Sequence, residues 1–318
     1  MSETGVPLKN KLNILPQNPE ESSPESVVGI GRFPSWLHRK LPKGPNLKET
    51  SHIIGENRLH TVCEEANCPN LMECWSKKTA TFLAMGKECT RNCGFCDIDF
   101  TKSPKPVEHD EPERIADSVK KLGLRHVVIT MVARDDLADG GAAHISNIIK
   151  EIRKQVDGVT IEVLTSDFAG NQEALDIVLS AMPEIFNHNI ETVRALTPRV
   201  RHTATYDRTL SILHQAKNRR KSPNMLVKSG LMLGLGESKK EVEETLQDLS
   251  QAGCDIVTIG QYLQPNRRKL LVKSFVHPYE FKFFEDFGRS IGISHMYCGP
   301  FVRSSYNADL ILERTMSK

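Results

Sequence analysis

From Thr79 onward, short apolar runs alternate with longer stretches in which apolar residues recur every three or four positions. The short runs predict buried strands, and the longer stretches predict amphipathic helices. The predicted strands are Thr79–Met85, His126–Val132, Thr160–Thr165, Glu184–Asn189, Leu226–Leu233 and Ile256–Leu263. The predicted helices are Glu113–Leu122, Ala142–Val156, Gln172–Ala181, Asp207–Asn218, Lys239–Gln251 and Tyr279–Ile291. Ser238 followed by Glu241 predicts a capping box, and Pro112 suits the first turn of its helix.

Six successive strand–helix units predict an α/β fold with a parallel sheet. Six units fall short of the eight that close a TIM barrel. We therefore expect an incomplete (βα)6 TIM-type barrel, with N-terminal and C-terminal extensions. The gap in such a barrel leaves a lateral opening through which a large substrate can enter.

The composition divides the chain into four parts. Residues 1–30 are rich in Pro, Ser, Asn and Glu without periodicity, which predicts a flexible N-terminal tail. Residues 31–75 have mixed polarity, several prolines and three cysteines, and we expect an irregular lobe wrapped on the main domain, with a short helix around Pro34–Arg39. Residues 76–292 contain the predicted barrel. Residues 293–318 form a C-terminal extension that contains the sequence RSSY.

Polar residues and glycines follow the predicted strands directly. In barrel folds, catalytic residues lie at the carboxyl ends of strands. Any single residue of this kind is most simply a loop residue bonded to its neighbours, but the shared position predicts that the group surrounds a site. The residues are Arg134, Asp135, Asp136, Gly140, Gly141, Asp167, His188, Asn189, Glu191, Gly234, Gly236, Glu237, Gln261 and Gln264.

The overall charge does not indicate a charged partner. Forty-two Lys and Arg against forty Asp and Glu leave a net charge of +2, which predicts no general affinity for nucleic acid or membranes. The N-terminus lacks the apolar core of a signal peptide, and the sequence has no run of about 20 apolar residues. We expect a soluble, cytoplasmic protein. In that reducing compartment, eight cysteines indicate metal binding or catalysis rather than disulfides.

Three cysteines follow the first predicted barrel strand in one loop. These are Cys89, Cys93 and Cys96, called here the downstream triplet. Three thiolates can ligate three irons of a four-iron cluster and leave the fourth iron open for a small chelating ligand. Zinc is the alternative, but a structural zinc site needs four ligands, and His109 lies thirteen residues beyond the last cysteine.

The spacing Cys-x3-Cys-x2-Cys, with an aromatic residue before the last cysteine, resembles the signature of radical S-adenosylmethionine enzymes. The resemblance implies that the open iron binds the amino and carboxylate groups of S-adenosylmethionine. An electron from the [4Fe–4S] cluster then cleaves the sulfonium and yields a 5′-deoxyadenosyl radical. Gly140 and Gly141 after the second strand are candidates to let the backbone approach this cofactor, although glycine pairs are also ordinary turns.

A second group lies upstream in the sequence CEEANCPNLMECW. Its cysteines, called here the upstream triplet, are Cys63, Cys68 and Cys74. Their polar surroundings do not predict a buried apolar core, so a second cluster is the better hypothesis. A fourth ligand must come from elsewhere, and on chemistry alone Cys254 and Cys298 are candidates, although Cys254 heads an apolar strand and is expected to pack as a small hydrophobic residue.

Three motifs together, CEEANCPN-x3-CW, CTRNCGFCDI and RSSYNA, resemble those of lipoyl synthases over roughly Gly31 to Ala308. The resemblance implies that a second [4Fe–4S] cluster is ligated by the upstream triplet and by Ser305. An alkoxide suits this soft chemistry less well than a thiolate and can leave during turnover. Arg303 is positioned in the sequence to stabilise the serine oxygen as an anion.

The resemblance implies a sulfurtransferase that inserts sulfur at carbons 6 and 8 of an octanoyl chain on a lipoyl carrier domain, with the second cluster as the sulfur source. Radical chemistry suits this step because no protein base usefully removes such protons. The implied partners are the acyltransferase subunits of 2-oxoacid dehydrogenases, the glycine cleavage H protein, an electron donor such as flavodoxin or ferredoxin, and a cluster-rebuilding protein.

A basic run is a candidate docking face for an acidic carrier domain, although such runs are usually solvated surface. It comprises Arg199, Arg201, Arg208, Lys217, Arg219, Arg220 and Lys221, with a possible extension at Arg267, Arg268 and Lys269. On the residues alone, two other classes stay open. One is a different radical enzyme, such as a small-molecule sulfur-inserting synthase or a methylthiotransferase, and the other is a zinc-binding interaction module.

Overall fold

The computed structural model describes residues 27–28, 33–38, 46–77 and 79–305. In this part of the chain, eight strands form one curved sheet. Their bounds are β2 His60–Thr61, β3 Thr81–Ala84, β6 His126–Met131, β7 Thr160–Leu164, β8 Ile185–Asn187, β9 Leu226–Leu233, β10 Ile256–Gln261 and β12 His295–Gly299. The strand order is β12-β10-β9-β8-β7-β6-β3-β2, and every pair is parallel except β2 with β3.

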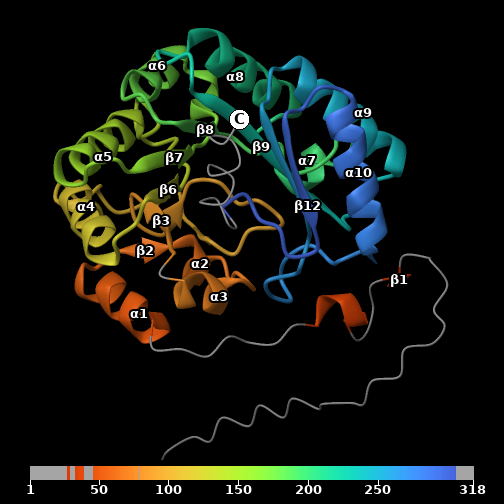
Figure 1. Ribbon diagram of the computed structural model, residues 1–318, viewed down its shortest axis with the longest axis horizontal. Coiled ribbons are helices and arrows are strands. Elements are labelled where there is room, and N and C mark those ends of the chain that lie inside the picture. The colour runs from red at the N-terminus through yellow and green to blue at the C-terminus, as the bar shows by residue number, and fades with distance from the viewer. Residues whose placement is uncertain (1–26, 29–32, 39–45, 78, 306–318) are drawn as a thin grey trace, which may run out of the picture.

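The six predicted barrel strands are confirmed, and two further strands extend the sheet. Strand β12 adds a seventh parallel strand beside β10, and β2 adds a short antiparallel edge beside β3. The sheet curves without closing, with its helices along the outer side (Figure 1). The incomplete barrel is therefore confirmed.

The helices that cover the barrel are those expected from the apolar periodicity. Their bounds are α4 Glu111–Leu122, α5 Ala142–Gln155, α6 Gln172–Ser180, α8 Tyr206–Arg219, α9 Lys239–Gln251 and α10 Pro278–Ser290. The side chains of Ser238 and Glu241 form the predicted capping box of α9, and Pro112 lies in the first turn of α4. Helix α4 ends at Gly123, whose left-handed backbone (φ 65°) favours glycine.

The segment before the barrel differs from the prediction. It is helical rather than irregular, with α1 Asn46–Glu56, α2 Val62–Glu65 and α3 Leu71–Ser76. We call residues 46–77 the N-terminal lobe. The short helix expected around Pro34–Arg39 is a 3-10 turn, η1 Ser35–Leu37, and Arg39 lies outside the described residues.

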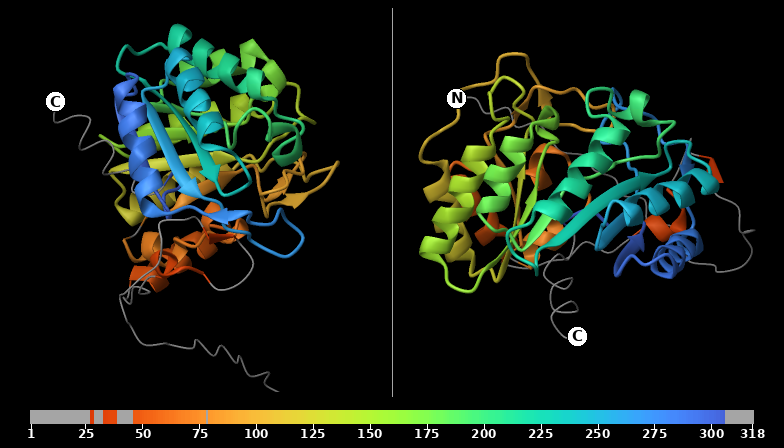
Figure 2. Two further views of the ribbon diagram at one scale, coloured as in Figure 1. Left: turned by 90° about the vertical axis from the view of Figure 1, so that its right-hand side faces the viewer. Right: turned by 90° about the horizontal axis from the view of Figure 1, so that it is seen from above.

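Tertiary contacts hold the N-terminal lobe together. The hydroxyl of Thr50 on α1 donates to the carbonyl of Trp75 on α3 (3.1 Å), and Trp75 and Ile54 are buried in the main core. Local propensity is weak in such short helices, so the prediction failed where packing decides. The lobe lies at the open side of the curved sheet (Figures 1 and 2).

Smaller elements complete the described structure. They are β1 Val27–Val28 paired with β11 Ser274–Phe275, β4 Glu88–Cys89 paired with β5 Asp99–Phe100, η2 Phe168–Gly170 and α7 Thr197–Val200. Apart from β1, the predicted tail at residues 1–30 lies outside the described residues, as does the chain after Ser305. No helix of the described residues is long and apolar enough to cross a membrane.

The inside of the barrel is polar at its base. The ammonium of Lys228 on β9 donates to both carboxylate oxygens of Glu162 on β7 (2.9 Å each), and Asn187 on β8 donates to the same carboxylate (2.8 Å). All three side chains are buried. Side chains two residues apart on a strand point to the same face. Glu162 lies two residues before Leu164 on β7, and Lys228 lies two residues before Gly230 on β9; Leu164 and Gly230 line the cavity described below. A neutralised ion pair therefore closes the barrel beneath that cavity.

Candidate active site

A cavity of about 1720 Å³ opens at the carboxyl ends of the barrel strands. All six cysteines of the two triplets line it, together with Ser305. Four parts of the chain contribute to its walls: the barrel with the downstream triplet, the N-terminal lobe, the stretch Phe33–His38 around η1, and the segment Pro300–Ser305, called here the C-terminal strap. Its volume exceeds the range of roughly 300–1000 Å³ that is typical of a single small-molecule site. The structure thus brings the two triplets and the serine to one site.

The loop of the downstream triplet is bonded to the barrel on several sides. Thr90 uses both its amide and its hydroxyl to bind the carbonyl of Ala133, beyond the end of β6 (3.0 and 2.9 Å). The amide of Gly94 donates to Val200, and its carbonyl accepts from Leu270 (2.9 Å each). A side chain at Gly94 would meet Leu270 at 3.0 Å, so close packing favours glycine here. The three cysteines are therefore presented by a well-supported loop.

Arg91 is the main ionic link between this loop and the strand ends. Its guanidinium makes a bidentate pair with Asp135 beyond β6 (2.6 and 2.8 Å) and a further pair with Asp167 beyond β7 (2.6 Å). Burial alone would raise the pKa of Asp167, but Arg91, His188 and Arg208 outweigh burial and lower it to about 2. Asp167 therefore stays ionised and holds the arginine at neutral pH. Neither aspartate lines the cavity; both bind Arg91 and so support the cysteine loop from outside it.

The upstream triplet lies on two short helices of the N-terminal lobe and on the loop between them, which carries Cys68. Cys63 is on α2, whose N-cap Thr61 accepts a hydrogen bond from the amide of Glu64. The amide of Cys68 donates to the carbonyl of Cys63 (3.1 Å), and the amide of Cys74 on α3 donates to that of Asn70 (2.9 Å). These backbone bonds order the three cysteines relative to one another.

Asp97 joins the loops of the two triplets. It follows Cys96 directly and accepts side-chain hydrogen bonds from Asn67, in the upstream loop, and from Asn266. Asn67 has a left-handed backbone (φ 48°), a conformation that asparagine tolerates better than most residues. The acidic residue after the downstream motif therefore fixes one cysteine group against the other.

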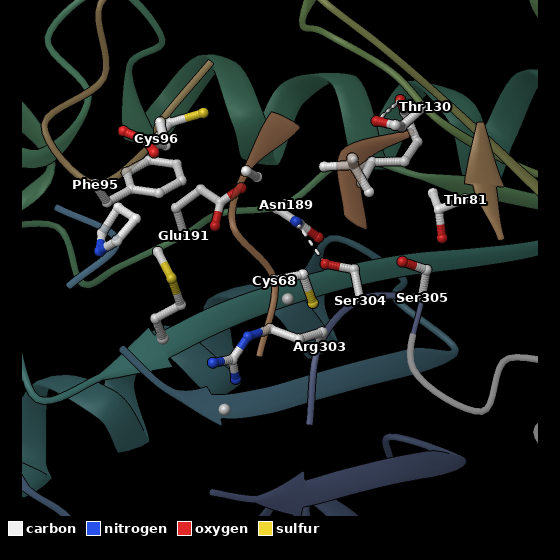
Figure 3. A pocket seen from close by; sticks show the side chains of 18 of the residues that line it. Cys68, Thr81, Phe95, Cys96, Thr130, Asn189, Glu191, Arg303, Ser304 and Ser305 are labelled. Atoms are coloured by element: carbon white, nitrogen blue, oxygen red, sulfur yellow. Dashed lines mark hydrogen bonds between the residues drawn. The ribbon is translucent and has the colours of Figure 1, made fainter. Parts of the chain in front are cut away.

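The C-terminal strap enters the cavity from the end of β12. Figure 3 shows Ser304 and Ser305 side by side, with Ser304 bonded to Asn189 from the end of β8. Arg303 uses Nη1 to donate to the carbonyls of Val302 (2.7 Å) and Pro300 (3.4 Å). The strap thus carries Ser305 into the site. Tyr306 of the RSSY sequence lies outside the described residues.

Comparison with known proteins identifies the chain. Residues 83–249, just over half of the chain, match the sequence model of the Radical SAM superfamily. A lipoyl synthase of Protochlamydia amoebophila is 67% identical over 312 residues, which cover 98% of this chain and 96% of that protein. A lipoyl synthase of Chlamydia muridarum is 52% identical over 299 residues, which cover 94% of this chain and 96% of that protein. This chain belongs to the lipoyl synthase family.

Solved structures resemble this lipoyl synthase family member in fold alone. Streptococcus suis SuiB bound to S-adenosylmethionine aligns with a TM-score of 0.55 at 12% identity, covering 72% of this chain and 53% of that one. The FeFe-hydrogenase maturase HydG from Carboxydothermus hydrogenoformans aligns with a TM-score of 0.51 at 15% identity, covering 85% and 78%. Since both alignments cover most of this chain, they support the partial-barrel architecture.

Membership of this family implies S-adenosylmethionine and two [4Fe–4S] clusters, and the donor set of the cavity fits them. Burial raises the pKa of Cys63 and of Cys96 to about 12 and that of Cys93 to about 11. Such thiols become thiolates at neutral pH only when a metal takes the place of the proton. No three His, Cys, Asp or Glu side chains in the described ranges converge on one point as ligands of a single ion. A [4Fe–4S] cluster takes each thiolate on a different iron, so its ligands need not meet at one point.

The two remaining cysteines, and the histidine considered as a zinc ligand, lie outside the cavity lining of this lipoyl synthase family member. Cys254 is buried in the main core, as expected of a small hydrophobic residue, and Cys298 on β12 packs against that core. Neither lines the cavity, so the structure gives no support to either as the fourth ligand. His109 is exposed and also lies outside the cavity lining.

The predicted strand-end residues divide into two groups. His188, Asn189, Glu191 and Gln264 line the cavity. Burial raises the pKa of Glu191 against the lowering effect of Arg201, and its backbone is left-handed (φ 67°), a strained state for a residue with a side chain. A left-handed backbone cannot be read from sequence in a non-glycine residue, so this signal was not accessible before the structure.

The remaining strand-end residues of this family member support the cavity from outside. Gly140 and Gly141 precede α5, and neither lines the cavity. A side chain at Gly141 (φ 90°) would approach the sulfur of Met85 to 2.4 Å, so glycine is required there for packing. Contact of the two glycines with the cofactor stays a prediction that their position does not support. The others outside the lining are Arg134, Asp135, Asp136, Asp167, Gly234, Gly236, Glu237 and Gln261.

Arg201 lies inside the site and not on a docking face. It is buried, lines the cavity and donates to the carbonyl of Asn189 (2.6 Å) and to the hydroxyl of Thr209. Its Nε has no hydrogen-bond partner among the described residues. Sequence adjacency placed Arg201 in the basic run, and only the fold shows that it is a cavity residue.

Proposed function

We propose that this chain inserts two sulfur atoms at carbons 6 and 8 of an octanoyl chain that is amide-linked to a lysine of a lipoyl carrier domain. One observation carries the proposal: both cysteine triplets and Ser305 line a single cavity, in a chain of the lipoyl synthase family. Shared access to one cavity allows the same substrate carbon to meet both reacting centres without leaving the site.

The two triplets take different roles in this proposal. The downstream triplet holds the cluster that binds S-adenosylmethionine, and the upstream triplet with Ser305 holds the cluster that supplies sulfur. When bound, these groups provide hydrogen abstraction from unactivated carbon and the sulfur atoms themselves. The protein contributes binding, orientation and exclusion of water.

The cavity walls suit a substrate with an apolar tail and a cofactor with charged ends. Apolar side chains of the barrel, such as Leu83, Leu164 and Leu231, form part of the lining. Glu191 and Arg201 face the same space and offer one carboxylate and one guanidinium. A zwitterionic amino-acid group pairs with such opposite charges, and burial strengthens that pairing. The chain therefore combines an apolar channel with a polar anchor.

The test is iron and sulfide content with product analysis after anaerobic reconstitution. The parent chain should bind about eight irons and convert an octanoylated carrier peptide to the lipoyl form, detected by mass. Cys63→Ala and Cys89→Ala should each retain about four irons and lose product. Cys254→Ala is the matched control, because that thiol is buried outside the cavity. Loss of both clusters from either single change would contradict the two-site assignment.

Ser305 is tested separately. Ser305→Ala should assemble or turn over the sulfur-supplying cluster poorly, while cleavage of S-adenosylmethionine at the other cluster persists. Ser250→Ala is the matched control, since its hydroxyl donates to the carbonyl of Ile291 (2.9 Å) and it lies outside the cavity lining. Near-normal sulfur insertion by Ser305→Ala would contradict the ligand assignment.

The docking face for the carrier domain needs revision. Arg208, Lys217 and Arg219 are paired with Asp167, Asp255 and Asp176 and are not available as a free positive surface. The exposed or half-exposed basic residues that remain from the predicted set are Arg199, Arg220, Lys221, Arg267, Arg268 and Lys269. Reversing three of these charges should weaken carrier binding and flatten its salt dependence. Unchanged binding at low salt would refute docking through these residues.

A further inference from the structure

The C-terminal strap carries Ser305 into the cavity without belonging to a helix or strand there. The strap follows β12 and comprises only six residues, Pro300–Ser305. Its start is held by backbone hydrogen bonds, from Gln261 on β10 to the carbonyl of Pro300 (3.3 Å) and from Val302 to the carbonyl of Gly299 (3.0 Å). Beyond this start, the position of the strap depends on individual contacts. Three such contacts come from three different parts of the fold.

The first contact comes from the N-terminal lobe. The side-chain amide of Asn70 donates to the carbonyl of Phe301 (2.7 Å), across 231 positions in the sequence. Asn70 is 1% exposed. It occupies the N-cap position of α3, where asparagine ordinarily accepts a bond from the helix backbone, yet its side chain makes no such bond. The side chain of Asn70 therefore bonds the strap and does not cap α3.

Asn70 also lies in the middle of the upstream triplet. Its own carbonyl accepts the amide of Cys74 (2.9 Å), and Cys68 is two residues before it. A single buried residue thus bonds a cysteine of the triplet through its backbone and the strap through its side chain. This arrangement sets the distance between the triplet and the serine-bearing segment.

The second contact comes from the barrel and is independent of the lobe. A Cβ atom added at Gly260 on β10 would lie 2.0 Å from the carbonyl oxygen of Val302 and 3.0 Å from a guanidinium nitrogen of Arg303. The backbone of Gly260 is not left-handed, so its glycine is explained by the close approach of the strap rather than by conformation. The third contact is the bond from Asn189 to the hydroxyl of Ser304 (2.7 Å).

We propose that Asn70 is a positioning residue that clamps the C-terminal strap to the N-terminal lobe and so places Ser305 opposite the upstream triplet. The inference rests on the proposed function, because it takes Ser305 as a cluster ligand. Asn70 itself does not touch the reacting atoms in this scheme. The strap is held between two surfaces, with Asn70 on one side and Gly260 on the other.

The test uses paired substitutions from the two sides in the full-length chain. Asn70→Asp keeps the shape but replaces the N–H donor with an oxygen that faces the Phe301 carbonyl. Its control is Asn46→Asp, because Asn46 also donates to a backbone carbonyl within the same lobe (Ser76, 3.0 Å). Gly260→Ala displaces the strap from the barrel side. Its control is Gly55→Ala on α1, where an added Cβ meets nothing within 4 Å.

The first readout is hydrogen exchange of the strap amides, which does not depend on any cluster. Loss of one buried hydrogen bond in Asn70→Asp should speed their exchange by about tenfold. The steric displacement of the strap in Gly260→Ala should speed it as well, and the controls should keep the parent rate. Parent-like protection of the strap in Asn70→Asp would overturn the inference. If that variant does not fold, Gly260→Ala decides the question, and unchanged strap exchange in it would overturn the two-sided clamp.

The second readout is the Mössbauer spectrum of the cluster on the upstream triplet, recorded with all three downstream cysteines changed to alanine. Asn70→Asp and Gly260→Ala should both shift the spectrum toward that of Ser305→Ala, while the controls keep the parent spectrum. Faster strap exchange with an unchanged spectrum would overturn the positioning role. A parent-like spectrum in Ser305→Ala itself would instead refute the proposed ligand set, which distinguishes failure of the proposed function from failure of the clamp.

Discussion

The buried guanidinium of Arg91 provides the strongest quantitative prediction for the loop of the downstream triplet. The side chain is 6% exposed and makes three short contacts to Asp135 and Asp167. Hydrogen bonds to charged groups contribute about 1.5–3 kcal/mol each, and removing one partner of a buried ion pair costs about 3–5 kcal/mol. Asp167 keeps its bond to Arg208 (2.5 Å), which offsets part of that loss. We therefore expect Arg91→Ala to destabilise the loop by about 3 kcal/mol.

Arg91→Lys is the more informative change. Lysine keeps the charge but cannot reproduce the planar fork that contacts two carboxylates at once. Arg91→Lys should therefore destabilise the loop about half as much as Arg91→Ala, by on the order of 1.5 kcal/mol. This free energy corresponds to roughly a tenfold effect on an equilibrium. The control is Arg194→Lys, because Arg194 pairs with Asp207 (2.5 Å) at the surface, where ion pairs contribute little.

The assay uses the Cys63→Ala background, so that the downstream cluster alone is loaded. Iron content after reconstitution and the Kd for S-adenosylmethionine are measured at equal ionic strength. We expect Arg91→Lys to weaken cofactor binding about tenfold and Arg91→Ala to load less than half of the iron, from the free energies above. An Arg91→Ala protein with full iron content and parent affinity would refute the view that the arginine holds the cysteine loop.

Three further predictions concern the support of the site. Lys228→Met should lower the free energy of unfolding by about 3–5 kcal/mol in urea titrations because it leaves Glu162 buried without its partner, and adding Glu162→Leu should restore much of the loss. Burial would raise the pKa of Glu162, but Lys228 and His126 outweigh it and lower the pKa to about 2. The stability that this carboxylate contributes should therefore be complete above about pH 4.5 and be lost progressively toward pH 2, and a Glu162→Leu, Lys228→Met chain should show a shallower acid transition. Gly141→Ala should destabilise folding through the clash with Met85 while S-adenosylmethionine affinity per folded molecule is unchanged; a selective loss of affinity would favour the cofactor role instead.

The sequence predicted the barrel well where local signals and burial agree. Strand β9 and helix α9 begin and end at the predicted residues, because apolar residues at both ends of LVKSGLML delimit the strand and a capping box starts the helix. Strand β12 was missed because it is an edge strand in which only Met296 is buried. The helices α2 and α3 are too short to form from propensity and depend on packing against the barrel.

The sequence predicts the candidate cluster ligands, but not the residues that hold those ligands in place. Cysteine spacing separates two groups, and motif resemblance adds Ser305 to one of them. No local pattern indicates that Asn70 reaches Phe301, because that contact joins positions 231 residues apart. In the basic run, closeness in sequence wrongly suggested a shared surface. Arg199 lies on the surface, whereas Arg201, two residues later, is buried inside the cavity.

The fold distinguishes two cysteine groups that spacing alone leaves equivalent. The loop of the downstream triplet is bonded directly to the ends of barrel strands, through Thr90 and Arg91, so its geometry follows that of the rigid sheet. The upstream triplet lies on short helices that face the barrel across the cavity, and its serine arrives on a strap held by single contacts. A centre that binds and cleaves a cofactor repeatedly benefits from the first arrangement, because preorganisation is retained between turnovers. A centre that gives up its own sulfur must release and regain ligands, and a strap whose hold depends on a few hydrogen bonds permits this at small energetic cost. The difference in support thus agrees with the division of roles proposed for the two clusters.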